Sequence, residues 1–200
     1  MAKTAITDNP IHEILAKRWS PRAFTAQPVS AEDLRSILEA ARWAASSYNE
    51  QPWRYIIATQ RQPDEFARLL DCLVPANQVW AKNAQVLMLG VVKDTFTQND
   101  TPNRVALHDL GAASASLTFE ATARGLVVHQ MGGILPDKAR ELFAIPEGFQ
   151  AVTGIAIGYE GDPETLPENM REFETAARTR KPLREMVFSR TWEDPAPVAS

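Results

Sequence analysis

The chain has 200 residues, of which 44% are hydrophobic and 23% charged. This composition is typical of a globular protein, and the length suits one domain with a sizeable core, so we interpret residues 1–200 as a single domain. Lys and Arg number 21 and Asp and Glu number 25, which gives a net charge of −4. The charge excludes the strongly basic class of domain that binds nucleic acid non-specifically, so we expect no nucleic-acid partner.

Several other features narrow the class of protein. Residues 86–92 form the longest apolar run and are too short to cross a membrane, so we expect no membrane association. Residues 1–10 lack the apolar core of a secretory signal and are predicted to be a flexible N-terminus. The single cysteine, Cys72, excludes an internal disulfide, and the three histidines are too dispersed to predict a metal site. We therefore expect a protein of the reducing cytoplasm.

The predicted elements begin with a capped helix. Ser30 is a typical N-cap with Asp33 three residues later, and the apolar spacing that follows predicts a helix over residues 31–45. The β-branched and aromatic residues 53–59 predict a strand. Residues 63–73 predict a second helix, with a proline in its first turn.

The middle of the chain contains the most apolar segment and the longest helical pattern. Residues 85–92 are continuously apolar, which is typical of a strand buried on both faces. A polar loop is predicted over residues 93–103, followed by a helix over residues 104–124 that Gly125 closes as a C-cap. Because residues 111–116 are all small and allow close packing, we expect this helix to be central.

The last predicted elements are a strand at residues 126–130, a helix at residues 136–144 and a buried strand at residues 151–159. Residues 161–200 form an extended C-terminal segment, polar and without periodicity up to residue 182, that we expect to wrap around a surface or a partner. Because strands and helices do not alternate strictly, the pattern favours an α+β fold over a doubly wound sheet.

Two basic clusters stand near opposite ends of the chain. Side chains alternate along an extended backbone, so Arg18, Ser20 and Arg22 would point to one side and form a cradle for a phosphate. Arg178 and Arg180 show the same alternation. Each cluster by itself is more often a solvated surface charge run. The common nucleotide, zinc-protease and serine-hydrolase motifs are missing from the sequence, so we name no catalytic residue.

Two further segments are candidates for ligand contacts. Residues 44–53 place short polar side chains after a helix, and a ring with alternating donors and acceptors, such as a flavin, needs such a rim. Gly132 and Gly133 follow a predicted strand and would let the backbone approach a ligand plane closely. The alternatives are an ordinary loop for the first segment and a tight turn for the second. The polar candidates in the first segment are Ser46, Ser47 and Asn49.

Taken together, these four features resemble the nitroreductase family of flavoproteins over residues 11–192. The most specific part is R-x-S-x-R-x-F at residues 18–24, followed by A-x-S-S-x-N-x-Q-P-W at residues 44–53. The resemblance implies a nitroreductase-like α+β fold with a central, mostly antiparallel sheet flanked by helices. It also implies an intertwined homodimer. Weaker matches are the glycine-rich turn ending at Gly133, the I-G-Y end of the last strand and the late R-x-R-x-P-L at residues 178–183.

The resemblance implies that FMN binds non-covalently at the dimer interface, with both subunits building each site. Arg18, Ser20 and Arg22 match residues that hold the phosphate, the ribityl chain and the pyrimidine side of the flavin. Arg178 and Arg180 match a basic pair at the phosphate. We therefore expect the two clusters to converge near FMN.

Other matched positions concern the flavin ring. Gly132 and Gly133 match a turn whose backbone faces flavin N5. Asn77 matches an asparagine near the pyrimidine edge, whereas Trp80 stands where some members have a lysine. The loop that would reach the flavin from the partner subunit is matched by Ser46, Ser47 and Asn49.

The implied activity is an FMN-dependent NAD(P)H oxidoreductase with a ping-pong mechanism. Hydride would pass from NADH or NADPH through flavin N5 to a small electron-poor acceptor such as a nitroaromatic, a quinone or an enal. The alternatives are a specialised dehalogenase, semialdehyde or enal reductase or flavin-fragmenting enzyme, and a flavin-binding protein without turnover. Residues 93–104 and the region after residue 160 are expected to build the acceptor pocket, with Tyr48 and Glu50 tuning it.

Overall fold

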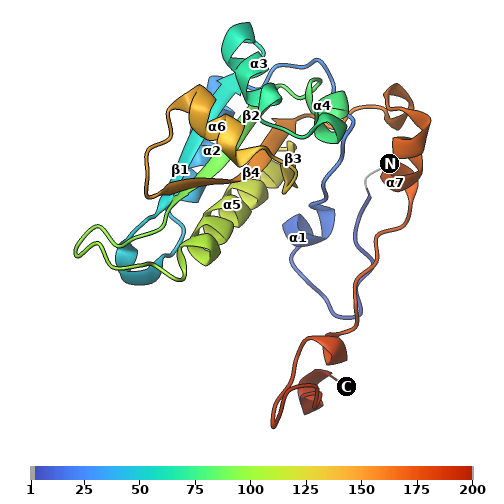
Figure 1. The fold of residues 1–200 in the computed structure, drawn as a ribbon. Coiled ribbons are helices and arrows are strands. Elements are labelled where there is room, and N and C mark those ends of the chain that lie inside the picture. Colours follow the sequence, from blue (N-terminus) through green and yellow to red (C-terminus); the bar gives the residue numbers. More distant parts are fainter. Residues whose placement is uncertain (1–2, 200) are drawn as a thin grey trace.

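The computed structural model describes residues 3–199, within which the strands form one four-stranded antiparallel sheet in the order β1-β2-β4-β3 (Figure 1). The α+β prediction is therefore confirmed. The strands are β1 (Trp53–Thr59), β2 (Val86–Lys93), β3 (Val127–Met131) and β4 (Phe149–Gly158). The helices are α1 (Glu13–Lys17), α2 (Ala31–Arg42), α3 (Pro63–Asp71), α4 (Pro75–Ala81), α5 (Ala106–Ala123), α6 (Pro136–Phe143) and α7 (Glu168–Thr175).

Helices cover both faces of the sheet. Figure 1 shows α2 and α5 on one face and α3 and α6 on the other. Strand β2 is buried on both faces, as predicted, because its alternating side chains enter two separate cores. Val86 and Met88 pack with Leu117 of α5, whereas Leu87 and Leu89 pack in the core that includes α3 and α6.

Local signals in the sequence account for most element boundaries. Ser30 Oγ accepts the backbone N–H of Asp33 at 2.9 Å and caps α2 as predicted. Helix α2 ends at Arg42, three residues earlier than predicted, because the following residues enter the 46–51 loop. Gly125 adopts φ +76 after α5, as the C-cap interpretation requires. The face of α5 that packs on α2 and the sheet contains small buried residues such as Ala113.

Three helices were missed by the sequence patterns: α1, α4 and α7. Helix α1 has five residues and buries none of them, so it carries no apolar periodicity. Helix α4 has only seven residues. The one buried side chain of α7 is Glu174, a carboxylate, so the usual sign of an inward-facing helix is missing.

The N-terminal segment lies beside α7, and the chain after α7 then leaves the domain (Figure 1). Lys3 Nζ donates to the carbonyl oxygen of Glu174 at 2.6 Å, and Ala5 N–H donates to Ala16 O at 2.9 Å. Residues 1–2 of the predicted flexible N-terminus lie outside the described residues. After α7, residues 183–199 extend away from the body and expose Trp192, whose relative accessibility is 82%. Within residues 3–199, no helix has the length and apolar character needed to cross a membrane.

Candidate functional site

A cavity of about 330 Å³ lies where the segment after α1 meets the segment after α7. Five basic side chains and one carboxylate line it, from both ends of the chain. The structure thus brings the two predicted basic clusters into one pocket, here called the anion pocket. Its charged lining residues are Lys3, Arg18, Arg22, Glu174, Arg178 and Arg180, and Ser20 also lines it.

The guanidinium groups of the anion pocket repel one another. Burial lowers the pKa of Arg18, and the charges of Arg178 and Arg180 lower it further. Burial, followed by the charge of Arg180, also lowers the pKa of Arg178. Arginine keeps its charge through such shifts. The pocket therefore concentrates positive charge that a bound anion would relieve.

The two C-terminal arginines are held differently. Arg178 Nη1 donates to the carbonyl oxygens of Lys3 and Ala16, both at 2.8 Å, so this side chain also joins the chain ends together. Arg180 is exposed, and within residues 3–199 its guanidinium donates only to Thr179 O at 2.7 Å. Of these two arginines, Arg180 therefore keeps more donors free for a ligand.

Glu174 organises the N-terminal side of the anion pocket, and the sequence analysis missed it. Its Oε1 accepts the backbone N–H groups of Arg22 at 2.6 Å and Ala23 at 3.1 Å. Its Oε2 lies 3.8 Å from Arg22 Nη1 and is buried without a hydrogen-bond partner among the described residues. A carboxylate among arginines neutralises part of their charge and fixes the backbone that carries them. The available signal was an acidic residue a few positions before the basic cluster of Arg178 and Arg180.

His129, also missed, holds the same segment from the sheet side. Its Nδ1–H donates to the carbonyl oxygen of Pro21 at 3.0 Å. Its ring packs against Trp80, with ring centroids 4.5 Å apart. Burial lowers the pKa of His129 from 6.5 to about 4, so the ring is neutral at neutral pH. Trp80 thus fills space behind the segment, which explains a large apolar residue at that position.

A second cavity of about 290 Å³ shares Arg18 and Ser20 with the anion pocket and extends along α5. Arg18 Nη1 donates to Ser20 Oγ at 3.3 Å between the two cavities. The amide of Gln130 lines the second cavity, where it donates to Ser114 O at 3.1 Å and Thr118 Oγ1 at 3.0 Å. A charged pocket that opens into a more apolar one suits a ligand with an anionic end and a ring.

Asn77 contacts Gly133, and neither of them nor Gly132 lines either of these two cavities as the described residues form them. Asn77 Nδ2 donates to Gly133 O at 3.0 Å, and a Cβ on Gly133 would lie 2.6 Å from that nitrogen. Packing against α4 therefore accounts for Gly133. A Cβ on Gly132 would meet nothing within 4 Å, so this glycine faces open space.

The loop with Ser46, Ser47 and Asn49 lies away from the anion pocket in the same chain. Ser47 N–H donates to Asp109 Oδ2 at 3.0 Å in the first turn of α5, whereas Thr118, much further along α5, lines the second cavity. These two positions are about 13 Å apart along the helix axis. One chain therefore does not combine all the predicted site residues in a single pocket.

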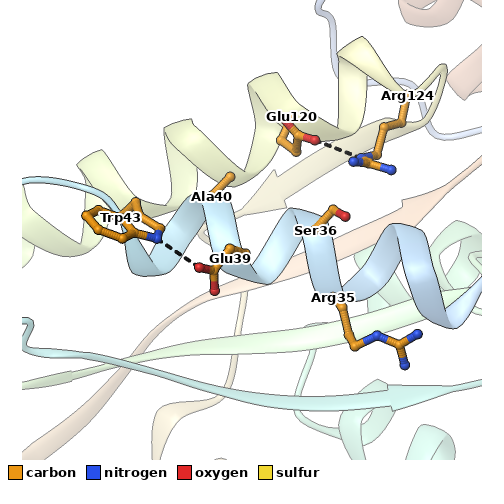
Figure 2. Close-up of a pocket in the computed structure, with 7 residues that line it drawn as sticks. All are labelled: Arg35, Ser36, Glu39, Ala40, Trp43, Glu120 and Arg124. Atoms are coloured by element: carbon orange, nitrogen blue, oxygen red, sulfur yellow. Dashed lines mark hydrogen bonds and ion pairs between the residues drawn. The ribbon is translucent and has the colours of Figure 1, made fainter.

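Another groove, of about 570 Å³, runs between α2 and α5 (Figure 2). Most of its acidic and basic groups are paired, with Arg35 as the exception among the described residues. Arg124 pairs with Glu120 at 2.7 Å and with Asp33 at 3.1 Å. Hydrogen bonds from Arg42 and Trp43 lower the pKa of Glu39 to about 2. With Glu39, Glu120 and Arg124 paired and only Arg35 left as an unpaired lining charge among the described residues, this groove is a weaker candidate for an anionic ligand than the anion pocket.

Comparisons with known proteins identify the family to which the chain belongs. The model of the nitroreductase family matches residues 15–159. The major NAD(P)H-flavin oxidoreductase of Aliivibrio fischeri is 28% identical over 211 aligned residues, covering 82% of this chain and 95% of that protein. A crystal structure of an oxidoreductase containing FMN superposes with a TM-score of 0.89 at 36% identity, covering 96% of this chain and 97% of that chain. A putative nitroreductase from Desulfovibrio desulfuricans, solved in complex with FMN, superposes with a TM-score of 0.70 at 25% identity, covering 93% and 99% of the two chains. On its fold and on the extent of the family match, the chain belongs to the nitroreductase family.

Proposed function

We propose that this protein is an FMN-dependent oxidoreductase that passes two electrons from NADH or NADPH to a small electron-poor acceptor. The observation that carries the proposal is the anion pocket, in which Arg18, Arg178 and Arg180 meet beside Ser20. The similarity to an oxidoreductase containing FMN and to an NAD(P)H-flavin oxidoreductase supports the choice of cofactor and reductant.

The residues present fit the phosphate of FMN. A phosphate dianion loses much hydration on binding and needs several charge-assisted donors in return. The anion pocket offers Arg18 and Arg180 near the hydroxyl of Ser20. The single negative charge of Glu174 does not cancel its basic side chains, so the pocket remains strongly positive. The adjoining cavity along α5 is the natural place for the ribityl chain and part of the ring, with Gln130 at its wall.

We further propose that the protein is a homodimer in which the partner completes the flavin site. The loop with Ser46 and Ser47 lies too far from the anion pocket of its own chain, and a second copy would bring it there. The same partner would cover exposed apolar residues of α5 such as Leu107, whose relative accessibility is 57%, and would receive the C-terminal extension. A monomer at micromolar concentration that retains FMN would contradict the dimer.

The chain's own residues would bind and orient rather than act as acids or bases. When bound, FMN would supply hydride acceptance from NAD(P)H and two-electron transfer to the acceptor, which takes its balancing protons from water. Arg22, held by Glu174, would stand near the flavin as a fixed positive charge and favour added negative charge on it. The backbone at Gly132 faces open space, in which a flat ring would fit.

Spectroscopy and a simple assay test the proposal. We expect purified protein to be yellow, to release FMN on denaturation, and to oxidise NADH or NADPH with a quinone as acceptor. The absence of flavin after reconstitution, or FAD as the sole flavin, would contradict it. Bound FMN that NAD(P)H does not reduce would favour a flavin-binding protein without turnover. Turnover with an enal or a halogenated substrate alone would favour a specialised member.

A further inference from the structure

The first described residues of the chain lie against the anion pocket, ahead of residues 15–159 that the family model matches. Lys3 lines the pocket, and the N–H of Ala5 donates to Ala16 O at 2.9 Å, near the end of α1. Figure 1 shows this N-terminal segment beside α7. Residues 3–5, here called the N-terminal strap, therefore contact both chain segments that build the pocket.

The side chain of Lys3 holds the C-terminal end of α7. Its Nζ donates to the carbonyl oxygens of Phe173 at 3.2 Å and Glu174 at 2.6 Å. The last carbonyls of a helix have no partner within the helix, and a positive charge is favourable there. The same ammonium lies 4.8 Å from the ring centroid of Trp19, another residue that lines the pocket. One side chain thus bridges α7 and the segment after α1.

The backbone of the N-terminal strap is held by an arginine of the anion pocket. Arg178 Nη1 donates to Lys3 O and to Ala16 O, both at 2.8 Å. Ala16 stands two residues before Arg18, the first residue of the N-terminal basic cluster. Because Arg178 also lines the pocket, the position of this guanidinium and the position of the strap depend on each other.

The charge of Lys3 adds to the repulsion inside the anion pocket. Burial lowers the pKa of Lys3, and the negative charges of Glu174 and Glu160 oppose this shift. The positive charges of Arg178 and Arg22 lower the pKa as well. A bound anion would offset this repulsion between like charges and favour the closed position of the strap. By linkage, a closed strap would favour the bound anion to the same extent.

We propose that the N-terminal strap completes the anion pocket, that Lys3 is a positioning residue for the site of the FMN phosphate, and that anion binding and strap closure stabilise each other. This inference rests on the proposed function, which supplies the phosphate as the anion. Lys3 acts through the end of α7, where Glu174 accepts the backbone N–H of Arg22. Riboflavin has no phosphate and should gain little from the strap.

Four variants separate the charge of Lys3 from the position of the strap. Lys3→Ala removes the ammonium, and Lys3→Arg keeps a positive charge with several donors and tests for rescue. Ala5→Pro removes the N–H that donates to Ala16 O and changes no side chain that lines the pocket. The matched control is Thr7→Pro, because the N–H of Thr7 makes no hydrogen bond to the described residues.

Flavin affinity is measured by titration of FMN and of riboflavin into each apo-protein. We expect Lys3→Ala to weaken FMN binding about three- to tenfold and riboflavin binding by less than about twofold. Lys3→Arg should bind FMN within about twofold of the wild type. Ala5→Pro should weaken FMN binding about two- to fivefold, and Thr7→Pro should leave it unchanged.

Hydrogen exchange at the amide of Ala5, followed by NMR, measures strap closure directly. FMN should slow this exchange in the wild type about three- to tenfold, the same factor by which Lys3 improves FMN binding. Riboflavin should slow it much less. In Lys3→Ala most of the protection by FMN should be lost, because the strap then no longer senses the charge in the pocket.

The outcomes distinguish this inference from the proposed function. Equal losses of affinity for FMN and riboflavin in Lys3→Ala, failure of Lys3→Arg to restore FMN binding, or Ala5 exchange that FMN does not slow would each overturn the strap. Bound FMN that NAD(P)H does not reduce would overturn the proposed function and leave the strap standing. If the wild type binds neither flavin, the proposed function fails, and inorganic phosphate replaces FMN in the exchange experiment: unchanged Ala5 exchange would then overturn the strap as well.

Discussion

The carboxylate of Glu174 accepts the backbone N–H of Arg22 at 2.6 Å, although the two residues are 152 positions apart. Through this bond a helix near the C-terminus fixes the segment that contributes Arg18, Trp19, Ser20 and Arg22 to the anion pocket. The same carboxylate accepts the N–H of Ala23 and lies 3.8 Å from the Arg22 guanidinium. Glu174 thus joins the two ends of the chain at the candidate site.

Replacement of Glu174 should lower the free energy of unfolding. Glu174→Ala leaves two backbone N–H groups without their acceptor and should lower the free energy of unfolding by about 3 kcal/mol. Glu174→Gln keeps an acceptor oxygen and should lose less than half as much. Urea denaturation of both apo-proteins measures this, and equal losses would contradict the hydrogen-bonding role.

Arg180→Ala should weaken FMN binding about ten- to a hundredfold and riboflavin binding much less. The reason is that charge-assisted bonds contribute roughly 1.5–3 kcal/mol each and riboflavin has no phosphate to receive them. Titration of both flavins into apo-protein separates a phosphate contact from general destabilisation. Arg61→Ala, at an exposed arginine in the turn between β1 and α3, is the matched control and should bind both flavins normally. Equal losses of affinity for the two flavins would indicate that Arg180 is an ordinary surface charge and does not contact the phosphate.

The free energy of unfolding should fall as the pH falls, because the unfolded chain binds a proton at His129 more readily than the folded protein does. The pKa of His129 in the folded state is about 4, below its ordinary value of 6.5. The stabilisation is fully present above pH 6.5 and is lost as pH falls towards 4, by up to about 3 kcal/mol at 1.36 kcal/mol per unit. Unfolding curves between pH 7 and pH 4 measure the loss.

The matched variant is His129→Asn, whose amide nitrogen can replace Nδ1 as donor to Pro21 and does not titrate. Its unfolding free energy should depend less on pH over the same range. An unchanged pH dependence in this variant would assign the acid sensitivity to another group.

The adjacent glycines should respond differently to alanine. In Gly133→Ala the new Cβ would lie 2.6 Å from Asn77 Nδ2 and 2.8 Å from Val74 Cγ2, so about 1–3 kcal/mol of stability should be lost. Gly132→Ala meets open space and should leave apo-protein stability unchanged. If Gly132 faces the flavin, its alanine variant should still bind FMN more weakly. Thermal unfolding with and without FMN measures both effects, and equal destabilisation by both substitutions would contradict the packing argument.

The sequence by itself determined the features that depend on neighbouring residues. β-Branched and aromatic residues located β1 at residues 53–59, and a Ser30 cap located the start of α2. Residue spacing was also enough to identify the basic clusters and the family they resemble. Such signals are readable because backbone preferences, caps and side-chain periodicity act over a few positions.

Only the tertiary structure decided what each candidate residue touches. Asn77 pairs with Gly133 across 56 positions, and His129 reaches Pro21 across 108. Helix α7 escaped prediction because its buried residue, Glu174, is charged, and a charge is buried only where distant partners compensate it. Those partners lie at the opposite end of the chain and are set by packing, which no local pattern records.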